Sequence, residues 1–550
     1  MTNSSFALDG DPGFAARSFL RSGGMSAESV RRRPVIGICT SWSELTPCNL
    51  PLRALAEAVK EGVAKAGGVA VEFPTISLSE ALVSPTTMYL RNLMAMDVEE
   101  MITASPIDGV VLLNGCDKTV AAQLMGAVSA DKPALSLGAG HRADGCFRGE
   151  SVSIDDAWRF IDERRTGLID DEEWLNLEGC LSPSAGVCNV LGTAITMGMI
   201  AEALGLALPG SSLAPAGSDE RVELAKRTGA TLVDLVSDGV RPSDVVTPES
   251  LKTAWRLLCT VGGSTNAVIH IQAIAGRAGI ELDPDELSAL ARATPTLTRV
   301  RPNGPFSLGD LHHAGGVPAI LSRLSGTTTA GGYHVMSDVI ASVEAPVSPI
   351  GAIALLKGTL CPDGAVIKRS AASPALLSHR GPAVVFDGLQ DLRKRIDTPE
   401  LDVDAKSVLV LRGAGPLGAP GMPEAGAIPI PRKLYRAGVR DMVRISDARM
   451  SGTAAGTVVL HVAPESAADG PLGLVQDGDE IEIDVEQGRL DLCVSEDELR
   501  RRAELRREAG PSVRAPDRGY ARLFQQNINQ ANEGCDFDFL RAKPRKEIEL

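Results

Sequence analysis

Residues 114–119, Asn-Gly-Cys-Asp-Lys-Thr, bring together three side chains of different chemistry. Cys116 offers a soft thiolate, Asp117 a hard carboxylate and Lys118 a titratable amine. Thiolates suit iron–sulfur clusters, whereas carboxylates suit Mg²⁺. Taken alone, the stretch leaves two interpretations equally open: a ligand-binding turn, or a buried inert cysteine beside a solvated Asp–Lys pair.

Two further cysteines lie in loops from which a thiolate could reach a ligand. Cys48 lies in the loop after the first predicted strand, residues 34–40. Cys188 lies in a loop rich in Gly and Ser that leads into a predicted helix, residues 194–204. Because a helix amino terminus lowers the pKa of a nearby thiol, Cys188 is favoured over Cys180 as a thiolate ligand.

Three more candidate groups also lie in predicted loops. Glu80 lies in the loop after the second predicted strand, just before the Cys116 unit. Glu424 and Ser451 follow much later, in or beside two loops rich in small residues, 413–425 and 446–453. A loop of this composition either links elements at the surface or packs its backbone against a ligand. Because each loop carries one reactive group, the ligand-binding interpretation is favoured.

The elements around these loops predict two domains. Strand and helix patterns alternate through residues 34–369 and predict an α/β domain with a doubly wound, mostly parallel sheet. Ligands of such sheets bind at the carboxyl ends of the strands, where the Cys48, Glu80 and Cys116 loops begin. Residues 370–550 contain short strands with turn residues between them, which predicts a C-terminal β-barrel. Residues 1–33 are interpreted as a mobile lead-in.

Composition narrows the class of protein. A chain of 550 residues is long enough for two or more domains. The net charge of −15, without a basic stripe, argues against a nucleic-acid partner. Because the sequence has no secretory signal and no apolar run long enough to span a membrane, we expect a soluble cytoplasmic protein. The 10 cysteines form no CxxC pair, so any cluster must be assembled from distant parts of the chain.

The ordered set of motifs resembles the dihydroxy-acid dehydratase and phosphogluconate dehydratase family. The motifs that carry this resemblance are, in chain order, residues 47–49, 114–119, 186–193, 262–266, 418–424 and 445–453. Two loops, 77–88 and 181–188, resemble the sugar-acid branch of the family, which includes the arabinonate and xylonate dehydratases. In that branch the cluster is usually [2Fe–2S], so this type is favoured over [4Fe–4S].

The resemblance implies a role for each candidate residue. Three cysteines match the ligands of an iron–sulfur cluster in which one iron has no protein thiolate: Cys48, Cys116 and Cys188. Four side chains match the ligands of Mg²⁺: Glu80, Asp117, Lys118 and Glu424. In the family this lysine is carbamylated, which turns an amine into an oxygen ligand. Ser451 matches the serine whose alkoxide is the catalytic base.

The implied activity is that of an iron–sulfur- and Mg²⁺-dependent hydro-lyase. It would dehydrate a sugar acid (an aldonate) to the 2-keto-3-deoxy acid, in a homodimer or homotetramer. Departures from the family pattern at four positions bear on the sugar pocket: Val120, Thr359, Cys361 and Ala455.

Three alternatives remain. The same chemistry could act on a branched dihydroxy acid in valine and isoleucine synthesis. An iron–sulfur electron carrier or sensor would leave Glu80, Glu424 and Ser451 without a task. A structural zinc protein would use the three cysteines, although ligands so far apart in sequence are unlike those of compact zinc modules.

Overall fold

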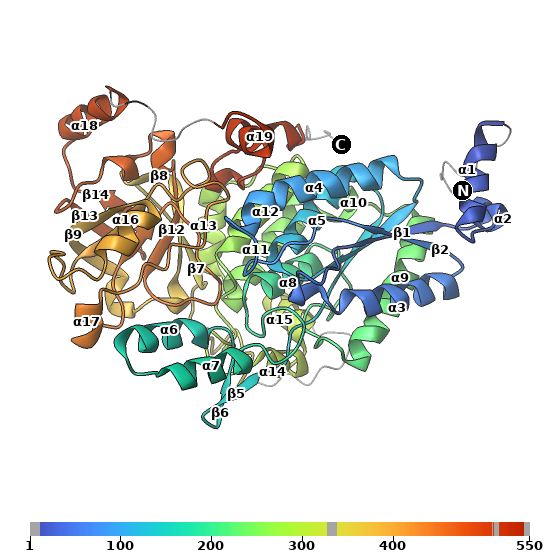
Figure 1. Ribbon diagram of the computed structural model, residues 1–550, viewed down its shortest axis with the longest axis horizontal. Helices are drawn as coiled ribbons and strands as arrows, with labels where there is room; N and C mark the ends of the chain where they lie inside the picture. The colour runs from blue at the N-terminus through green and yellow to red at the C-terminus, as the bar shows by residue number, and fades with distance from the viewer. Residues whose placement is uncertain (1–10, 327–337, 509, 511–515, 544–550) are drawn as a thin grey trace.

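The computed structural model describes residues 11–326, 338–508, 510 and 516–543, and it shows an α/β region beside a β-barrel (Figure 1). The α/β region is built on a four-stranded parallel sheet. Its strands, in spatial order, are β2 (Val69–Pro74), β1 (Val35–Thr40), β3 (Gly109–Asn114) and β4 (Ala134–Gly138). Every residue of β1 and β3 is buried, as expected for strands covered on both faces.

Helices cover both faces of this sheet. Ile36 and Ile38 point toward one face, which packs against α3 (Leu52–Lys65) and α9 (Asp219–Asp238). The alternate residue Val35 points toward the other face. That face packs against α4 (Thr87–Ala104) and α5 (Asp117–Ala130), with α8 (Thr193–Ala203), α11 (Pro248–Val261) and α12 (Asn266–Arg277) in the same core. The predicted doubly wound α/β arrangement is therefore confirmed.

The C-terminal region contains a closed eight-stranded barrel. Its strands are, in chain order, β7 (Ile353–Gly358), β8 (Cys361–Lys368), β9 (Ser378–Asp387), β10 (Val408–Arg412), β11 (Arg444–Ser446), β12 (Val458–Ala463), β13 (Glu480–Asp484) and β14 (Arg489–Leu492). Inward-facing Val, Ile and Leu residues fill its interior. The predicted β-barrel is confirmed, and each of its six predicted strands overlaps an observed one.

The barrel begins earlier in the chain than predicted. Strands β7 and β8 pair with each other and belong to the barrel, whereas the sequence analysis had ended the α/β domain at residue 369. The physical reason is that both strands are covered on two sides. Ile367 faces the barrel interior, while Ile353 and Val366 pack against the helices of the α/β region. Two buried faces give an apolar run that resembles a strand of a parallel sheet.

Smaller elements complete the fold. Residues 11–33, predicted to be a mobile lead-in, form helices α1 (Asp11–Ser22) and α2 (Ala27–Arg32), which project from one end of the molecule; residues 1–10 lie outside the described residues (Figure 1). The remaining α-helices of the α/β region are α10 (Pro242–Val245), α13 (Pro284–Ala293), α14 (Leu308–His313) and α15 (Gly316–Ser325). Those of the barrel region are α16 (Gly388–Arg395), α17 (Arg432–Arg436) and α18 (Glu496–Glu508).

Two segments connect the α/β region with the barrel. Residues 145–181, called the insert below, contain β5 (Gly145–Phe147), β6 (Glu150–Val152), α6 (Asp156–Thr166) and α7 (Asp171–Cys180) around a small core of their own. After the barrel, α19 (Gly519–Asn527) returns to the α/β region, where Phe524 packs with Met88 and Ile269 (Figure 1). Within the described residues, no helix combines the length and apolar character that crossing a membrane requires.

Candidate active site

One edge of the parallel sheet gathers the first group of predicted site residues. In the register of the sheet, Thr40 at the end of β1 lies beside Pro74 of β2 and Leu113 of β3. The loops that leave these three strand ends carry the Cys48, Glu80 and Cys116 side chains. The expectation that these loops share the carboxyl edge of the sheet is therefore confirmed.

The Cys48 and Cys116 loops are held together by one asparagine. Asn49 Oδ1 accepts a hydrogen bond from the backbone N–H of Cys116 at 3.0 Å. The Asn49 amide also donates to Ser41 O at 2.8 Å and to Ser77 Oγ at 3.0 Å. Cys116 is the residue just before α5, so Asp117 and Lys118 lie in the first turn of that helix. The three reactive side chains of residues 116–118 are thus fixed by a helix start and a side-chain clamp.

Two loops of the barrel region approach the same edge. The backbone of the 446–453 loop packs directly on the α/β region at Gly452. A Cβ atom on Gly452 would lie 2.8 Å from Ser264 Cβ and 3.2 Å from Gly192 Cα. No larger side chain fits there, which explains why the loop needs a small residue. This docking brings Glu424 and Ser451 to the Cys116 side of the interface.

A cavity of about 90 Å³ lies where these loops meet. Its lining includes all but one of the predicted site residues: Cys48, Glu80, Cys116, Asp117, Cys188, Glu424 and Ser451. The remaining predicted residue, Lys118, is fully buried and forms ion pairs with three of the lining carboxylates. Segments that are more than 300 residues apart in the sequence therefore converge on one small space.

The thiols lie on one side of the cavity. The Cys48 and Cys116 side chains are hydrogen-bonded to each other, which lowers the pKa of Cys48 to about 7 and raises the pKa of Cys116. The Arg142 guanidinium donates to Cys48 Sγ at 3.8 Å and further favours the thiolate. Burial raises the pKa of the Cys188 thiol to about 12. A metal centre that binds a buried thiol also removes its proton, so this burial does not prevent ligation.

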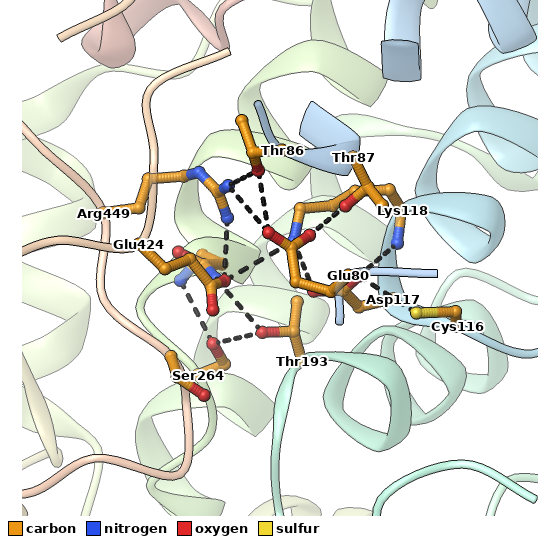
Figure 2. A network of polar contacts seen from close by, with 12 residues as sticks. Glu80, Thr86, Thr87, Cys116, Asp117, Lys118, Thr193, Ser264, Glu424 and Arg449 are labelled. Atoms are coloured by element: carbon orange, nitrogen blue, oxygen red, sulfur yellow. Dashed lines mark hydrogen bonds and ion pairs between the residues drawn. The ribbon is translucent and has the colours of Figure 1, made fainter. Parts of the chain in front are cut away.

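The carboxylates form a second group. Oxygen atoms of Glu80, Asp117 and Glu424 all lie within 4.8 Å of one another. The Lys118 ammonium lies among them, 3.3 Å from Glu80 Oε2 and 3.5 Å from Glu424 Oε1, and it also pairs with Asp117. Figure 2 shows Glu424 facing this group from the barrel side, opposite Glu80 and Lys118.

Arg449 contributes a second buried positive charge. Its guanidinium lies 2.9 Å from Glu424 Oε1 and 3.8 Å from Glu80 Oε1 (Figure 2). It also donates to Met422 O at 2.7 Å and to Thr86 Oγ1 at 3.1 Å. One side chain therefore ties the barrel loops to the loop that carries Glu80.

Burial and these cations act in opposite directions on the two glutamates. Burial alone would raise the pKa of Glu80, but Lys118, Arg449 and hydrogen bonds from Thr86 and Thr87 outweigh it and lower the pKa to about 2. At Glu424 burial dominates and raises the pKa, although the same two cations oppose it. Glu80 is thus held as a carboxylate.

Ser451 lies within reach of two hydrogen-bond donors from one residue. Its Oγ atom is 2.7 Å from Thr453 Oγ1 and 3.3 Å from the backbone N–H of Thr453. A serine oxygen that receives two donors is better able to carry negative charge. The arrangement is therefore suited to a serine that acts as a base.

The donor chemistry fits both groups implied by the resemblance. Three thiols at one end of the cavity suit an iron–sulfur cluster, and three carboxylates at the other suit a hard divalent cation. The buried ammonium of Lys118 now supplies positive charge at the carboxylate group. A cation bound there would be repelled by that ammonium, so the fit requires Lys118 to lose its charge.

Sequence comparisons place the chain among known enzymes. Residues 33–337 match the N-terminal domain of the dihydroxy-acid/6-phosphogluconate dehydratase family, and residues 338–535 match its C-terminal domain. The chain belongs to this dehydratase family. Its N-terminal match ends at residue 337, before β7, which agrees with the early start of the barrel.

Similar proteins within the family act on different acids. The chain is 47% identical to the 6-deoxy-6-sulfo-D-gluconate dehydratase of Pseudomonas putida, over 98% of this chain and 96% of the relative. It is 46% identical to the L-arabonate dehydratase of Azospirillum brasilense, over 99% and 97%. Identity to the dihydroxy-acid dehydratase of Carboxydothermus hydrogenoformans is 36%, over 95% and 97%.

One argument of the sequence analysis is wrong. Cys188 was expected to lie at the amino end of a helix that lowers its pKa, but α8 begins at Thr193 and the thiol pKa is raised by burial. Cys188 nevertheless lines the cavity. Cys180 ends α7 in the insert and does not line it.

The departures from the dehydratase-family pattern fall mostly outside the cavity. Thr359 lies in the β7–β8 turn and hydrogen-bonds with Asp491, and Cys361 packs inside the barrel. Val120 is buried in α5, and Ala455 is an exposed residue just after the Ser451 loop. None of these four side chains lines the cavity, so the sugar pocket must be shaped by other residues.

Sequence reasoning missed the side chains that hold the site residues in place. Arg449 occurs in a quoted motif without an assigned role, and Asn266 likewise, although its amide donates to Glu424 Oε1 at 2.7 Å. Asn266 is held in turn by Thr193, 3.3 Å from its Nδ2 atom. A basic or amide residue next to a reactive one was the available signal, but spacing alone cannot show which carboxylate it contacts.

Proposed function

We propose that this protein is a sugar-acid dehydratase that converts an aldonate to its 2-keto-3-deoxy acid. The observation that carries the proposal is the single cavity in which three thiols, three carboxylates and Ser451 converge. Higher identity to relatives named for gluconate and arabinonate derivatives than to a dihydroxy-acid dehydratase supports the sugar-acid substrate class.

The cofactors of the proposed enzyme are an iron–sulfur cluster, with [2Fe–2S] favoured, and Mg²⁺. Cys48, Cys116 and Cys188 would hold the cluster. Four groups would hold Mg²⁺: Glu80, Asp117, Glu424 and a carbamylated Lys118. Carbamylation would replace the ammonium with an anionic oxygen ligand and remove its repulsion of the metal. When bound, these groups supply Lewis acidity at the leaving hydroxyl and at the carboxylate end of the substrate.

The residues of the chain then handle the proton. Ser451, as the alkoxide, takes the proton from C2 of the substrate, while the Thr453 O–H and N–H groups donate to Ser451 Oγ. The C3–O bond breaks and the hydroxyl group leaves as water after taking up a proton. The resulting enol tautomerises to the 2-keto-3-deoxy acid. No electrons are gained or lost overall, so the reaction needs no oxidant.

The test is an anaerobic assay of the purified holoprotein against a panel of aldonic acids and 2,3-dihydroxyisovalerate. We expect 2-keto-3-deoxy product from at least one aldonate, at a higher kcat/KM than for the branched acid. The Ser451→Ala variant should lose turnover by about 10²- to 10⁴-fold, the usual contribution of a general base, with its iron content unchanged. Product from the branched acid alone would favour the dihydroxy-acid alternative, and turnover by Ser451→Ala near the wild-type rate would refute the base.

A further inference from the structure

Trp158, from the insert, reaches the proposed catalytic serine through one intervening side chain. Its indole Nε1–H donates to Thr453 Oγ1 at 2.8 Å, and Thr453 Oγ1 lies 2.7 Å from Ser451 Oγ. The two bonds form a chain that starts in α6 and ends on the barrel loop. Neither sequence spacing nor the family motifs connect residue 158 with this loop.

The directions of these hydrogen bonds follow from the chemistry of the groups. An indole N–H can only donate, so Thr453 Oγ1 accepts from Trp158. The single hydrogen of the Thr453 hydroxyl remains available, and Ser451 Oγ lies at hydrogen-bond distance for it. Once Ser451 loses its proton, only Thr453 can donate in this pair. A donor that itself accepts a hydrogen bond is a stronger donor, so the indole strengthens the bond to the alkoxide.

The insert is fixed on both sides of the cleft between domains, so Trp158 is held in position. Arg301 of the α/β region pairs with Asp155 and Asp156, at the start of α6. Arg165, near the end of α6, lies 2.8 Å from Asp397 of the barrel region. The helix is thus tied to both regions, with Trp158 between the two ties.

Packing does not explain the presence of tryptophan at this position. Trp158 is 39% exposed, and it does not belong to the core of the insert, which packs around Phe147 and Phe160. Trp174 of the same insert does pack against that core. The hydrogen bond to Thr453, rather than burial of the ring, is what distinguishes Trp158.

We propose that Trp158 is a positioning residue that directs the Thr453 hydroxyl group toward Ser451 Oγ. The inference rests on the proposed function, because it assigns Trp158 to the step in which Ser451 takes the C2 proton. It predicts that loss of the indole N–H slows this step and leaves substrate binding unchanged.

The test compares Trp158→Phe with Trp174→Phe, using the aldonate turned over fastest in the panel, both unlabelled and deuterated at C2. For Trp158→Phe we expect kcat to fall by about tenfold, the effect of losing one hydrogen bond to a charged group, with KM within twofold. The isotope effect on kcat should rise because proton removal becomes slower. Trp174→Phe should keep the wild-type isotope effect. Melting temperature and the visible spectrum of the cluster show whether each variant is folded and loaded.

A double-mutant cycle separates action through Thr453 from any other role. If Trp158 acts through Thr453, Trp158→Phe should cost little further activity in a Thr453→Val background. An equal loss in both backgrounds, a rise in KM alone, or an unchanged kcat and isotope effect would overturn the proposal. Site-specific replacement of Trp158 by 3-benzothienylalanine, which exchanges the N–H for sulfur in a ring of the same shape, should reproduce the Trp158→Phe result.

A spectroscopic readout does not depend on turnover. In ¹⁵N-indole-labelled holoprotein, the Nε1–H signal assigned with Trp158→Phe should shift upfield in Thr453→Val, and the other tryptophan signals should not. An unchanged Trp158 signal would contradict the contact. Failure of the proposed function gives a different pattern: no aldonate product in the panel, or full activity in Ser451→Ala.

Discussion

Two buried glutamates of the barrel region show how neighbours decide the chemistry of a carboxylate. Glu424 lies with Glu80 and Asp117, close enough for the three to share a cation. Glu465 accepts hydrogen bonds from the backbone of Leu417 and Gly418, and burial raises its pKa to about 7. Only Glu424 is aimed at the cavity, so only Glu424 should bind metal.

Exchange of each glutamate for glutamine tests this difference. Glu424→Gln keeps the shape of the side chain but removes an anionic oxygen ligand, so the Mg²⁺ concentration for half-maximal activity should rise at least about tenfold. Glu465→Gln resembles the protonated form of that residue and should change the same concentration less than twofold. A magnesium titration of both holoenzymes provides the measurement, and equal shifts in the two variants would contradict the assignment of Glu424.

At the residue scale, the sequence predicted the reactive groups but not their supports. Cys48, Cys116 and Ser451 were recognisable because thiols and a hydroxyl in glycine-rich loops are chemically distinctive. The roles assigned to them stay predictions, although the structure brings them together at one cavity. Arg449 and Trp158 could not be found in this way, because their partners lie in segments remote in sequence.

At the scale of elements, the close approach of two loops depends on a glycine between them. A Cβ atom on Gly115 would clash with the side chain of Asn49 and lie 2.8 Å from Cys48 O. Gly115→Ala should therefore push the Cys48 and Cys116 loops apart. Gly138, at the end of the neighbouring strand β4, has room for a methyl group, since the nearest atom would lie 3.8 Å away.

We expect Gly115→Ala to retain less than about half of the wild-type iron after anaerobic reconstitution, because preorganised ligands are what give a metal site its affinity. Gly138→Ala should retain the wild-type amount. Iron and acid-labile sulfide analysis of the two variants measures the effect. Wild-type iron content in Gly115→Ala would show that the spacing of these loops is not critical.

Strand β8 ends in a lysine whose charge is poorly accommodated. Lys368 is 2% exposed, and within the described residues its Nζ atom has no hydrogen-bond partner. Burial lowers its pKa from the ordinary 10.5 to about 7. Between these two pH values the unfolded chain holds a proton that the folded chain has released. The free energy of unfolding of the wild type should therefore rise with pH across this range, as far as this residue is concerned.

Lys368→Met removes both the charge and this pH dependence. The variant should be more stable than the wild type by about 2 kcal/mol at pH 7, the cost of an unsatisfied buried polar group, and the difference should shrink toward pH 10. Differential scanning calorimetry from pH 6.5 to 9.5 measures it. Lys357→Met, on the exposed side of β7, should show no such trend. A difference that grows with pH would mean that Lys368 is charged in the folded protein at neutral pH.

Element-scale prediction failed where local patterns are ambiguous. The α/β rhythm and the later barrel strands were readable from periodicity, but β7 and β8 have two buried faces and resemble strands of a parallel sheet. The start of α8 was placed too early, since the small residues before Thr193 continue the loop. In both cases tertiary contacts, rather than the local sequence, set the boundary.

At the scale of the whole molecule, the C-terminal segment ties the α/β region to the chain end. Asp536 accepts hydrogen bonds from Arg277 Nε at 2.6 Å and Nη2 at 3.1 Å, and both side chains are buried. Arg91 donates to the backbone of Gly534 and Cys535. No repeat or motif in the sequence predicted this return of the chain, because it is built from single long-range contacts.

Asp536→Ala should destabilise the protein by about 3 kcal/mol, since it leaves the Arg277 guanidinium buried with less compensation. Asp538→Ala, two residues further along and exposed, is the matched control and should have no measurable effect. Thermal unfolding of the two holoproteins provides the comparison. Equal melting temperatures for both variants would show that the segment contributes little to the fold.

The central claim is that the two regions meet to hold soft and hard ligands at one cavity. Anomalous diffraction from crystals of the anaerobically purified protein, recorded on both sides of the iron absorption edge, tests it most directly. We predict an iron peak bonded to the sulfur atoms of Cys48, Cys116 and Cys188, at the end of the cavity away from Glu424. An iron peak elsewhere, or thiols without bound metal in protein that contains stoichiometric iron, would contradict the account.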